Sequence, residues 1–94
     1  MIKISIIIPV FNEVKTVEKI VQKIKNKNKL FNLEIILVDD GSTDGTTELL
    51  KKNLKKKVSH LLFHKKNKGK GFAIKTGKKK ASGKIILIQD ADLE

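Results

Sequence analysis

The sequence predicts an α/β fold, a Rossmann-like parallel sheet with helices packed on its faces. Four apolar runs alternate with three segments whose apolar residues recur at helical spacing. This alternation is typical of parallel strands joined by right-handed crossovers. The 94 residues contain no internal repeat and no linker, so we expect one small domain or part of a larger one.

The predicted strands are short apolar runs that end in polar segments. The first covers residues 3–9 and is closed by the only proline, and the second and third cover 33–38 and 58–63. The last run, Ile85 to Ile88, is continuous and apolar, which predicts a central strand buried on both faces. In the 94-residue chain itself we expect this strand to lie at or near a sheet edge, with apolar faces that require cover.

The first two helices are predicted from apolar spacing and from residues that favour a helix start. The first is expected to begin near Asn12 or Glu13 and to end within residues 26–29. The second follows three good N-cap types, Ser42, Thr43 and Asp44.

The third helix follows a glycine-containing turn at residues 67–71. Its small residues Ala73, Gly77 and Ala81 fall on one helical face, which predicts a close approach to the sheet. Gly83 predicts a left-handed stop at its C-terminal end.

Composition narrows the class of protein. The chain has 21 basic and 10 acidic residues, a formal net charge of +11, and no cysteine, which excludes disulfides and thiolate metal sites. A surplus of this size favours nucleic acid, an anionic membrane surface or phosphorylated ligands, although a solvated lysine-rich surface explains it equally well. Four phenylalanines without Trp or Tyr argue against specific nucleic-acid binding by base stacking.

The location of the chain is predicted from its apolar segments. No apolar run approaches the roughly 18 residues of a membrane span. Residues 1–5 lack the zones of a signal peptide. We therefore expect a cytoplasmic chain, peripheral on the cytoplasmic face of a membrane if its basic surface binds lipid.

The last strand runs directly into two carboxylates, Asp90 and Asp92. In extended backbone, residues two apart point the same way, so both acids would face one spot at a strand's carboxyl end. Such a pair suits Mg²⁺ or Mn²⁺, which take one or two carboxylates together with substrate phosphate oxygens. An isolated D-x-D tripeptide is also common as a plain polar strand end.

Three further polar clusters follow the other predicted strands, at residues 9–13, 39–44 and 67–71. In a parallel sheet the carboxyl ends of all strands meet at one edge, so the four clusters predict a ligand cleft there. Glu13 and Asp40 could accept hydrogen bonds from a base or ribose, or could simply stabilise helix N-termini. Gly69 and Gly71 would let the backbone approach a phosphate, with Lys70 adding positive charge, or would form a plain turn.

Together these four clusters resemble family 2 glycosyltransferases. The motifs are IIIPVFNE at 6–13, VDDGSTD at 38–44, NKGKG at 67–71 and QDADLE at 89–94, in the order that the family has them. The likeness is greatest to the branch that transfers mannose or glucose to dolichyl or polyprenyl phosphate. It implies that residues 1–94 are the N-terminal, nucleotide-sugar-binding part of a GT-A fold, truncated after the D-x-D motif.

The resemblance also implies roles for single residues. It assigns a set of residues to the nucleotide-sugar pocket: Pro9, Phe11, Glu13, Val38, Asp40, Lys70, Asp90, Ala91 and Asp92. Asp92 would be the principal ligand of Mg²⁺ or Mn²⁺, with Asp90 and Glu94 beside it, although relatives often have Gln at position 94. Phe11 stands where Tyr is frequent and keeps the stacking face without the hydroxyl.

The implied reaction transfers a hexose from a GDP- or UDP-linked sugar to a polyprenyl or dolichyl phosphate. No residue is assigned as the catalytic base, which is expected downstream of Glu94, so the chain is expected to be inactive alone. Three alternatives stay open: a sugar-phosphate nucleotidyltransferase, a receiver module and a basic nucleic-acid-binding module. The first usually has a glycine- and arginine-rich loop after strand one, and this chain has no arginine.

Overall fold

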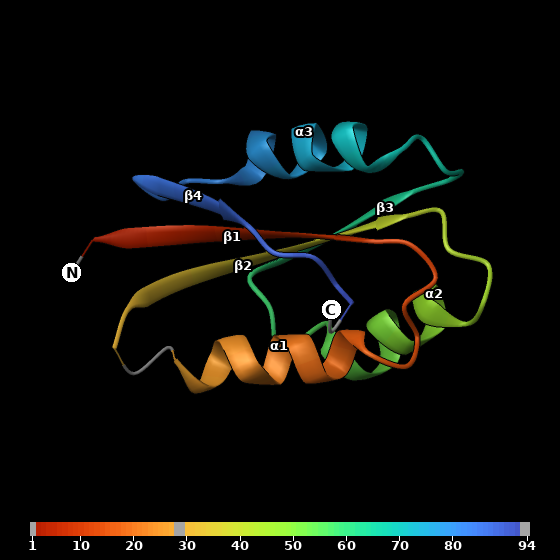
Figure 1. Cartoon of the computed structure of the whole chain (residues 1–94), viewed down its shortest axis with the longest axis horizontal. Coiled ribbons are helices and arrows are strands. Elements are labelled where there is room, and N and C mark those ends of the chain that lie inside the picture. Colours follow the sequence, from red (N-terminus) through yellow and green to blue (C-terminus); the bar gives the residue numbers. More distant parts are fainter. Residues whose placement is uncertain (1, 28–29, 93–94) are drawn as a thin grey trace.

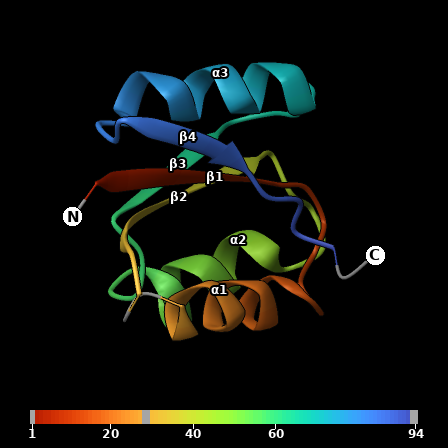
Figure 2. The same ribbon diagram turned by 60° about the vertical axis from the view of Figure 1, so that its left-hand side comes forward.

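The computed structural model describes residues 2–27 and 30–92 and consists of three layers. Four parallel strands form a sheet in the order β3-β2-β1-β4, with α3 on one face and α1, α2 and η1 on the other (Figure 1). Figure 2 shows the same layers from a second direction. The elements are β1 (Lys3–Val10), α1 (Val17–Asn26), β2 (Asn32–Asp40), α2 (Thr46–Leu49), the π-helix η1 (Leu50–Leu54), β3 (His60–His64), α3 (Lys70–Lys80) and β4 (Ile85–Ile88).

This arrangement confirms the predicted α/β class, the parallel sheet and the order of the elements. In β1, Ile7 lies in register with Ile36 of β2 on one side and Ile88 of β4 on the other. Because all strands run the same way, their carboxyl ends lie along one edge. Among the helices of the described ranges, none has both the length and the hydropathy to span a membrane.

The core divides into two clusters because successive side chains of a strand point to opposite faces. The face that α1 and η1 cover holds the larger cluster, which includes Ile6, Ile8, Val10, Ile35, Leu37, Leu50 and Leu54. The face that α3 covers holds a smaller cluster of Ile7, Ile36, Val38 and Ala73.

Helix α3 lies close to the sheet, as its small residues predicted. Ala73 is fully buried, and a Cβ atom added at Gly77 would lie 2.6 Å from Cγ2 of Ile7. A larger side chain at either position would push the helix away from β1 and β2.

The prediction that Ile85–Ile88 is a central strand buried on both faces is wrong, whereas the expectation that it lies at or near a sheet edge in this chain is confirmed. Strand β4 lies at the edge of the sheet, and its four side chains are 41–50% exposed. Only β1 pairs with it among the described residues. A continuous apolar run indicates a strand that can be covered on both faces, but it does not distinguish a central strand from an edge strand.

The first helix begins later than predicted. Helix α1 starts at Val17 rather than near Asn12 or Glu13. Asn12 has a left-handed backbone conformation, with a φ of 54°, which is incompatible with a helix start at this residue. A turn then leads into the helix, where the amide of Val17 donates to the carbonyl of Glu13 at 3.0 Å.

The residues predicted to cap the second helix act in part as expected. Asp44 accepts a hydrogen bond from the backbone amide of Thr46 at 3.0 Å, although the residue at the N-cap position is Gly45, with a φ of 98°. Helix α2 therefore begins at Thr46, two residues after Asp44.

Gly83 is required for a different reason from the one predicted. Its φ is not positive, and α3 ends because Ala81 is already extended, with φ −66° and ψ 131°. A Cβ atom at Gly83 would lie 2.6 Å from the backbone nitrogen of Ser5. The glycine therefore allows the segment after α3 to pass directly against β1.

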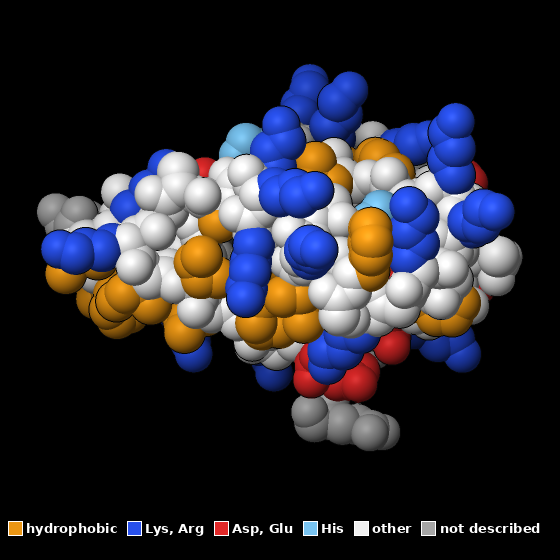
Figure 3. All heavy atoms as spheres, turned by 90° about the horizontal axis from the view of Figure 1, so that it is seen from above, with side chains coloured by type: hydrophobic (Ala, Val, Ile, Leu, Met, Phe, Trp, Pro, Cys, Tyr) orange, Lys and Arg blue, Asp and Glu red, His pale blue; other side chains and the backbone are white. Residues whose placement is uncertain are grey.

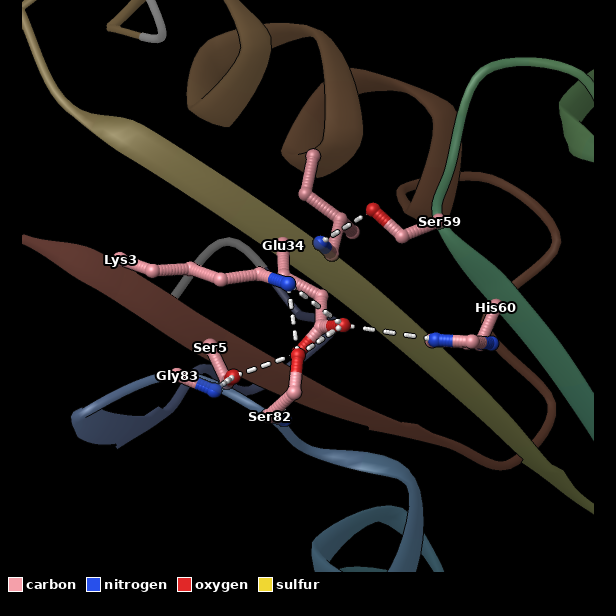
Figure 4. Close-up of polar contacts among 8 residues, drawn as sticks. Lys3, Ser5, Glu34, Ser59, His60, Ser82 and Gly83 are labelled. Atoms are coloured by element: carbon pink, nitrogen blue, oxygen red, sulfur yellow. Dashed lines mark hydrogen bonds and ion pairs between the residues drawn. The ribbon is translucent and has the colours of Figure 1, made fainter.

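A buried carboxylate holds this segment in place at the amino end of the sheet (Figure 4). Glu34 of β2 accepts hydrogen bonds from the Ser5 hydroxyl at 2.6 Å and from the Ser82 amide and hydroxyl at 2.9 and 3.0 Å. His60 Nε2 and Lys3 Nζ lie 3.4 and 3.5 Å from Oε2. Glu34 of β2 thus links β1 and β3 to the segment between α3 and β4.

These contacts keep Glu34 ionised. Burial alone would raise its pKa, but hydrogen bonds from Ser5 and Ser82 and the charge of Lys3 outweigh burial and lower the pKa to about 2. A carboxyl whose pKa is lower in the folded chain than in the unfolded chain stabilises the fold above the unfolded value. This contribution is lost as the pH falls from about 4.5 towards 2.

We predict that Glu34→Gln lowers the free energy of unfolding by roughly 3 kcal/mol at pH 7, because the charge-dependent contacts are lost. The difference between wild type and variant should shrink as the pH falls towards 2, and urea denaturation at several pH values measures it. Glu18→Gln, at an exposed position of α1, is the matched control and should change little. A constant difference across this pH range would contradict the assigned role of the Glu34 charge.

Candidate functional site

A cleft opens at the carboxyl ends of the strands. It has a volume of about 360 Å³ and is bounded by the segments that follow β1, β2, β3 and β4. Its lining residues are Pro9, Val10, Phe11, Glu13, Asp40, Asn67, Gly69, Lys70, Ala73, Asp90, Ala91 and Asp92. The four clusters that the sequence places at this edge therefore do converge on one cavity.

The structure brings together eight of the predicted site residues. Pro9, Phe11, Glu13, Asp40, Lys70, Asp90, Ala91 and Asp92 all line the cleft. Val38 does not: it is fully buried in the cluster beneath α3, in contact with the core rather than the cavity. Glu94 lies outside the described residues.

Three lining residues were not assigned to the site from the sequence, whereas Gly69 was expected to let the backbone approach a ligand. Asn67 belongs to the NKGKG turn, so the motif that located the turn could have identified it. Val10 and Ala73 contribute apolar surface, and only the strand alternation and the small-residue face of α3 hint at their position.

The loops after β1 and β2 are held to each other by Asn12. Its backbone amide donates to the Ser42 hydroxyl at 2.9 Å, and its side-chain oxygen accepts from the Thr43 amide at 2.7 Å. These bonds explain the left-handed conformation of Asn12. They also position its neighbours Phe11 and Glu13 at the mouth of the cleft.

The two adjacent acids of β2 have different roles because they point to opposite faces of the sheet. Asp39 accepts hydrogen bonds from the Ser42 amide and hydroxyl at 3.2 and 2.6 Å, and from the Thr47 hydroxyl. It thereby shapes its own loop. Asp40 points to the α3 side and lines the cleft.

Asp40 organises the turn before α3. Its carboxylate accepts from the amides of Lys68 and Gly69, both at 2.9 Å, and lies 2.7 Å from Nδ1 of His64. Burial alone would raise the pKa of Asp40, but the bonds from His64, Lys68 and Gly69 lower it. The two backbone amides that could have met a phosphate at this turn are therefore already bonded to Asp40.

The D-x-D segment is anchored by its middle residue. Ala91 is 4% exposed and packs into the core on the α1 side, and its carbonyl accepts from the Thr16 hydroxyl at 2.7 Å. Strand β4 has already ended at Ile88, so Asp90 and Asp92 do not lie in extended strand as predicted. Both nevertheless line the cleft, and Asp90 forms an ion pair with Lys70.

The carboxylate oxygens in the cleft suit a divalent cation that takes oxygen ligands. Asp90 and Asp92 both offer carboxylate oxygens to the same cavity. Within residues 2–27 and 30–92, no three Asp, Glu or His side chains are grouped closely enough to hold a metal ion by themselves. Such a site would need further oxygens, as the phosphates of a ligand provide.

The charge of the cleft contrasts with that of the chain. Glu13, Asp40, Asp90 and Asp92 meet there with one cation, Lys70, although the whole chain has a net charge of +11. Such a cavity would repel a bare polyphosphate and would favour one that is complexed with a cation.

The family model described as "Glycosyl transferase family 2" matches residues 5–94. The chain belongs to glycosyl transferase family 2. This membership confirms the predicted family and argues against the nucleotidyltransferase and receiver alternatives.

The names of two curated relatives refer to lipid phosphates. The chain is 37% identical over 92 residues to the dolichol-phosphate mannosyltransferase of Pyrococcus furiosus. It is 40% identical over 96 residues to the undecaprenyl-phosphate 4-deoxy-4-formamido-L-arabinose transferase of Yersinia pestis. These alignments cover 98% of this chain but 26% and 29% of the relatives, so the chain spans about a quarter of their length.

Solved structures of glycosyltransferases share the fold. Mannosyltransferase PcManGT from Pyrobaculum calidifontis, in complex with GDP-Man and Mn²⁺, matches with a TM-score of 0.80 and 28% identity over 95% of this chain and 27% of its own. S. aureus TarS 1-349, in complex with UDP-GlcNAc, also gives 0.80 and 28%, over 96% of this chain and 26% of its own. These neighbours confirm the predicted GT-A type of fold.

Proposed function

We propose that residues 1–94 form the donor-binding part of a glycosyltransferase that moves a hexose from a GDP- or UDP-linked sugar to a polyprenyl or dolichyl phosphate. The observation that carries this proposal is the cleft itself. Eight residues from four separate motifs line one cavity of about 360 Å³ that is acidic within a basic chain. A sugar nucleotide complexed with a metal ion has the size and charge that suit such a cavity.

In this proposal the nucleoside lies against the segment after β1. Pro9 and Phe11 offer apolar surface, and Phe11 is 44% exposed, so its ring is accessible to a base. Glu13 and Asp40 accept hydrogen bonds from the base or the ribose. Val38 acts indirectly, since it packs with Ala73 beneath the cavity.

The diphosphate is proposed to lie near Lys70 and the D-x-D segment. Asp92, with Asp90 and Glu94, would hold Mg²⁺ or Mn²⁺. When bound, the ion offsets the charge that develops on the departing nucleoside diphosphate. The pairing of Asp90 with Lys70 keeps both side chains at the cavity before a ligand arrives. That PcManGT is complexed with GDP-Man and Mn²⁺ supports this assignment.

We assign the acceptor site and the catalytic base to the part of the relatives' sequences that this chain does not span. We therefore expect the 94-residue chain to bind a donor without transferring sugar. Turnover by the purified chain would contradict this expectation, because it would require a base among residues 1–94.

We predict weak donor binding that depends on the metal. In calorimetry with GDP-mannose and UDP-glucose, Mn²⁺ should strengthen binding of the preferred donor by about tenfold, or about 1.4 kcal/mol. Asp92→Asn should abolish this gain and leave the metal-free affinity nearly unchanged, since it removes a charge without changing the size of the side chain.

Glu18→Gln is the matched control, because Glu18 is an exposed acid of α1 outside the cleft. It should retain the full metal effect. Equal metal stimulation in Asp92→Asn and wild type would remove Asp92 from the metal site. No binding of either donor by wild type would contradict the proposed function.

The lipid-phosphate acceptor suggests a peripheral contact with an anionic membrane. Lysine side chains project from many points of the α3 face, among apolar and other side chains (Figure 3). Residues 65–84 contain nine lysines, and no acid occurs between residues 65 and 89. Each well-placed lysine contributes about 1 kcal/mol to binding at an anionic leaflet.

We predict that the chain sediments with phosphatidylglycerol vesicles, less at high salt, and much less with phosphatidylcholine vesicles. Neutralising Lys75, Lys78 and Lys79 of α3 to Gln should reduce binding more than neutralising Lys51, Lys52 and Lys55 of the opposite layer. Equal binding to both lipids, or equal losses in both triple variants, would contradict a membrane contact through α3.

A further inference from the structure

A buried histidine that does not line the cleft connects the cleft to α3. His64, the last residue of β3, has a side chain only 8% exposed, beside an Asp40 side chain that is 4% exposed. Nδ1 lies 2.7 Å from Asp40 Oδ1, and Nε2 lies 2.8 Å from the hydroxyl oxygen of Thr76 in α3. The ring thus bridges β2 and the helix that covers it.

The position of this ring is determined on its remaining side by Phe72. The two rings meet edge to face, with centroids 5.4 Å apart and planes at 71°. Lys68 Nζ lies 4.8 Å from the centre of the Phe72 ring on the outside. The imidazole is therefore held between a carboxylate, a hydroxyl and an aromatic edge.

The protonation of the ring follows from these partners. A carboxylate oxygen that is ionised only accepts hydrogen bonds, so the hydrogen of this pair is on Nδ1. The Thr76 hydroxyl can either donate to Nε2 or accept from it, so this contact is compatible with both states of Nε2. In either state the ring presents the Nδ1–H to Asp40.

The N–H of His64 limits how many further hydrogen bonds Asp40 can accept. Oδ1 already accepts from His64 and from the Lys68 amide, and Oδ2 accepts from the Gly69 amide. A carboxylate has about four acceptor positions, so one on Oδ2 is left for the cleft. Without His64, the carboxylate could rotate, and the amides of the turn at 67–69 would lose their fixed acceptor.

We propose that His64 is a positioning residue for donor binding, which acts through Asp40 and touches no donor atom. It holds the Asp40 carboxylate at the cleft so that Asn67 and Gly69 keep their places in the lining. The proposal rests on the proposed function, since it concerns the same cleft. Nothing in the motifs of the sequence marks His64, because it falls between VDDGSTD and NKGKG.

The first test uses ¹⁵N NMR of the imidazole rings in the wild-type chain, which needs no variant to fold. We expect the His64 ring to carry a proton on Nδ1 and this N–H to be hydrogen-bonded to a carboxylate. A His64 ring with hydrogen only on Nε2 would overturn the proposal, whether or not any sugar nucleotide binds.

The second test uses variants and calorimetry with the donor that wild type prefers. His64→Phe keeps an aromatic ring but removes the N–H that bonds to Asp40. We expect it to bind the sugar nucleotide about tenfold more weakly, as for one lost charge-assisted hydrogen bond. His64→Asn returns an N–H near the position of Nδ1 and should recover part of the affinity. His60→Phe, on the same strand but outside the cleft, is the control and should bind like wild type.

Hydrogen exchange at the Lys68 and Gly69 amides separates positioning from general destabilisation. These amides should exchange faster in His64→Phe, while amides in the centre of β1 and β2 stay protected. If wild type binds a donor and His64→Phe binds it equally well, the positioning role is wrong and the proposed function stands. If wild type binds none, the proposed function fails and the role in donor binding fails with it, while the NMR and exchange results still decide whether His64 holds Asp40 and the turn at 67–69.

Discussion

Parallel pairing of β1 with β2 and β4 is the constraint on which the rest of the structure depends. Because every strand runs the same way, four segments that are far apart in the sequence finish at one edge, and their polar residues share a single cavity. The same pairing brings the amino ends together at the opposite edge. There Glu34 connects the strands to the segment after α3. One edge thus carries the candidate donor site, and the other carries a network that stabilises the sheet.

The face of β2 that α3 covers shows how alternation distributes these roles. Glu34, Ile36, Val38 and Asp40 lie on this face, so a carboxylate stands at each end of a short apolar segment. Hydrogen bonds lower the pKa of both acids despite their burial. Both acids bind amides of the segments that flank α3, Ser82 after it and Lys68 and Gly69 before it. The helix is therefore fixed at its two ends by charged groups and along its length by the close contact of Gly77 with Ile7.

Much of the fold and most of the cleft could be predicted from the sequence, because both follow from repeated local signals. Apolar periodicity located the strands and helices, and polar residues directly after strands located the cleft. What could not be predicted depends on contacts between distant residues. Gly83 is needed because Ser5 lies against it, and Glu34 is tolerated in a buried strand because Ser5 and Ser82 meet it. Val38, which was expected to line the cleft, is buried because it packs with Ala73 of α3.

The central claim is that the acidic cleft binds a nucleotide sugar. Amide chemical-shift mapping of the ¹⁵N-labelled chain, titrated with GDP-mannose or UDP-glucose in the presence of Mg²⁺, tests this claim most directly. The account predicts shift changes confined to residues 10–13, 40, 67–70 and 90–92, with the amides around Glu34 at the opposite edge unaffected. Changes spread over the lysine-rich surfaces of α3 and η1, or no changes at saturating ligand, would contradict it.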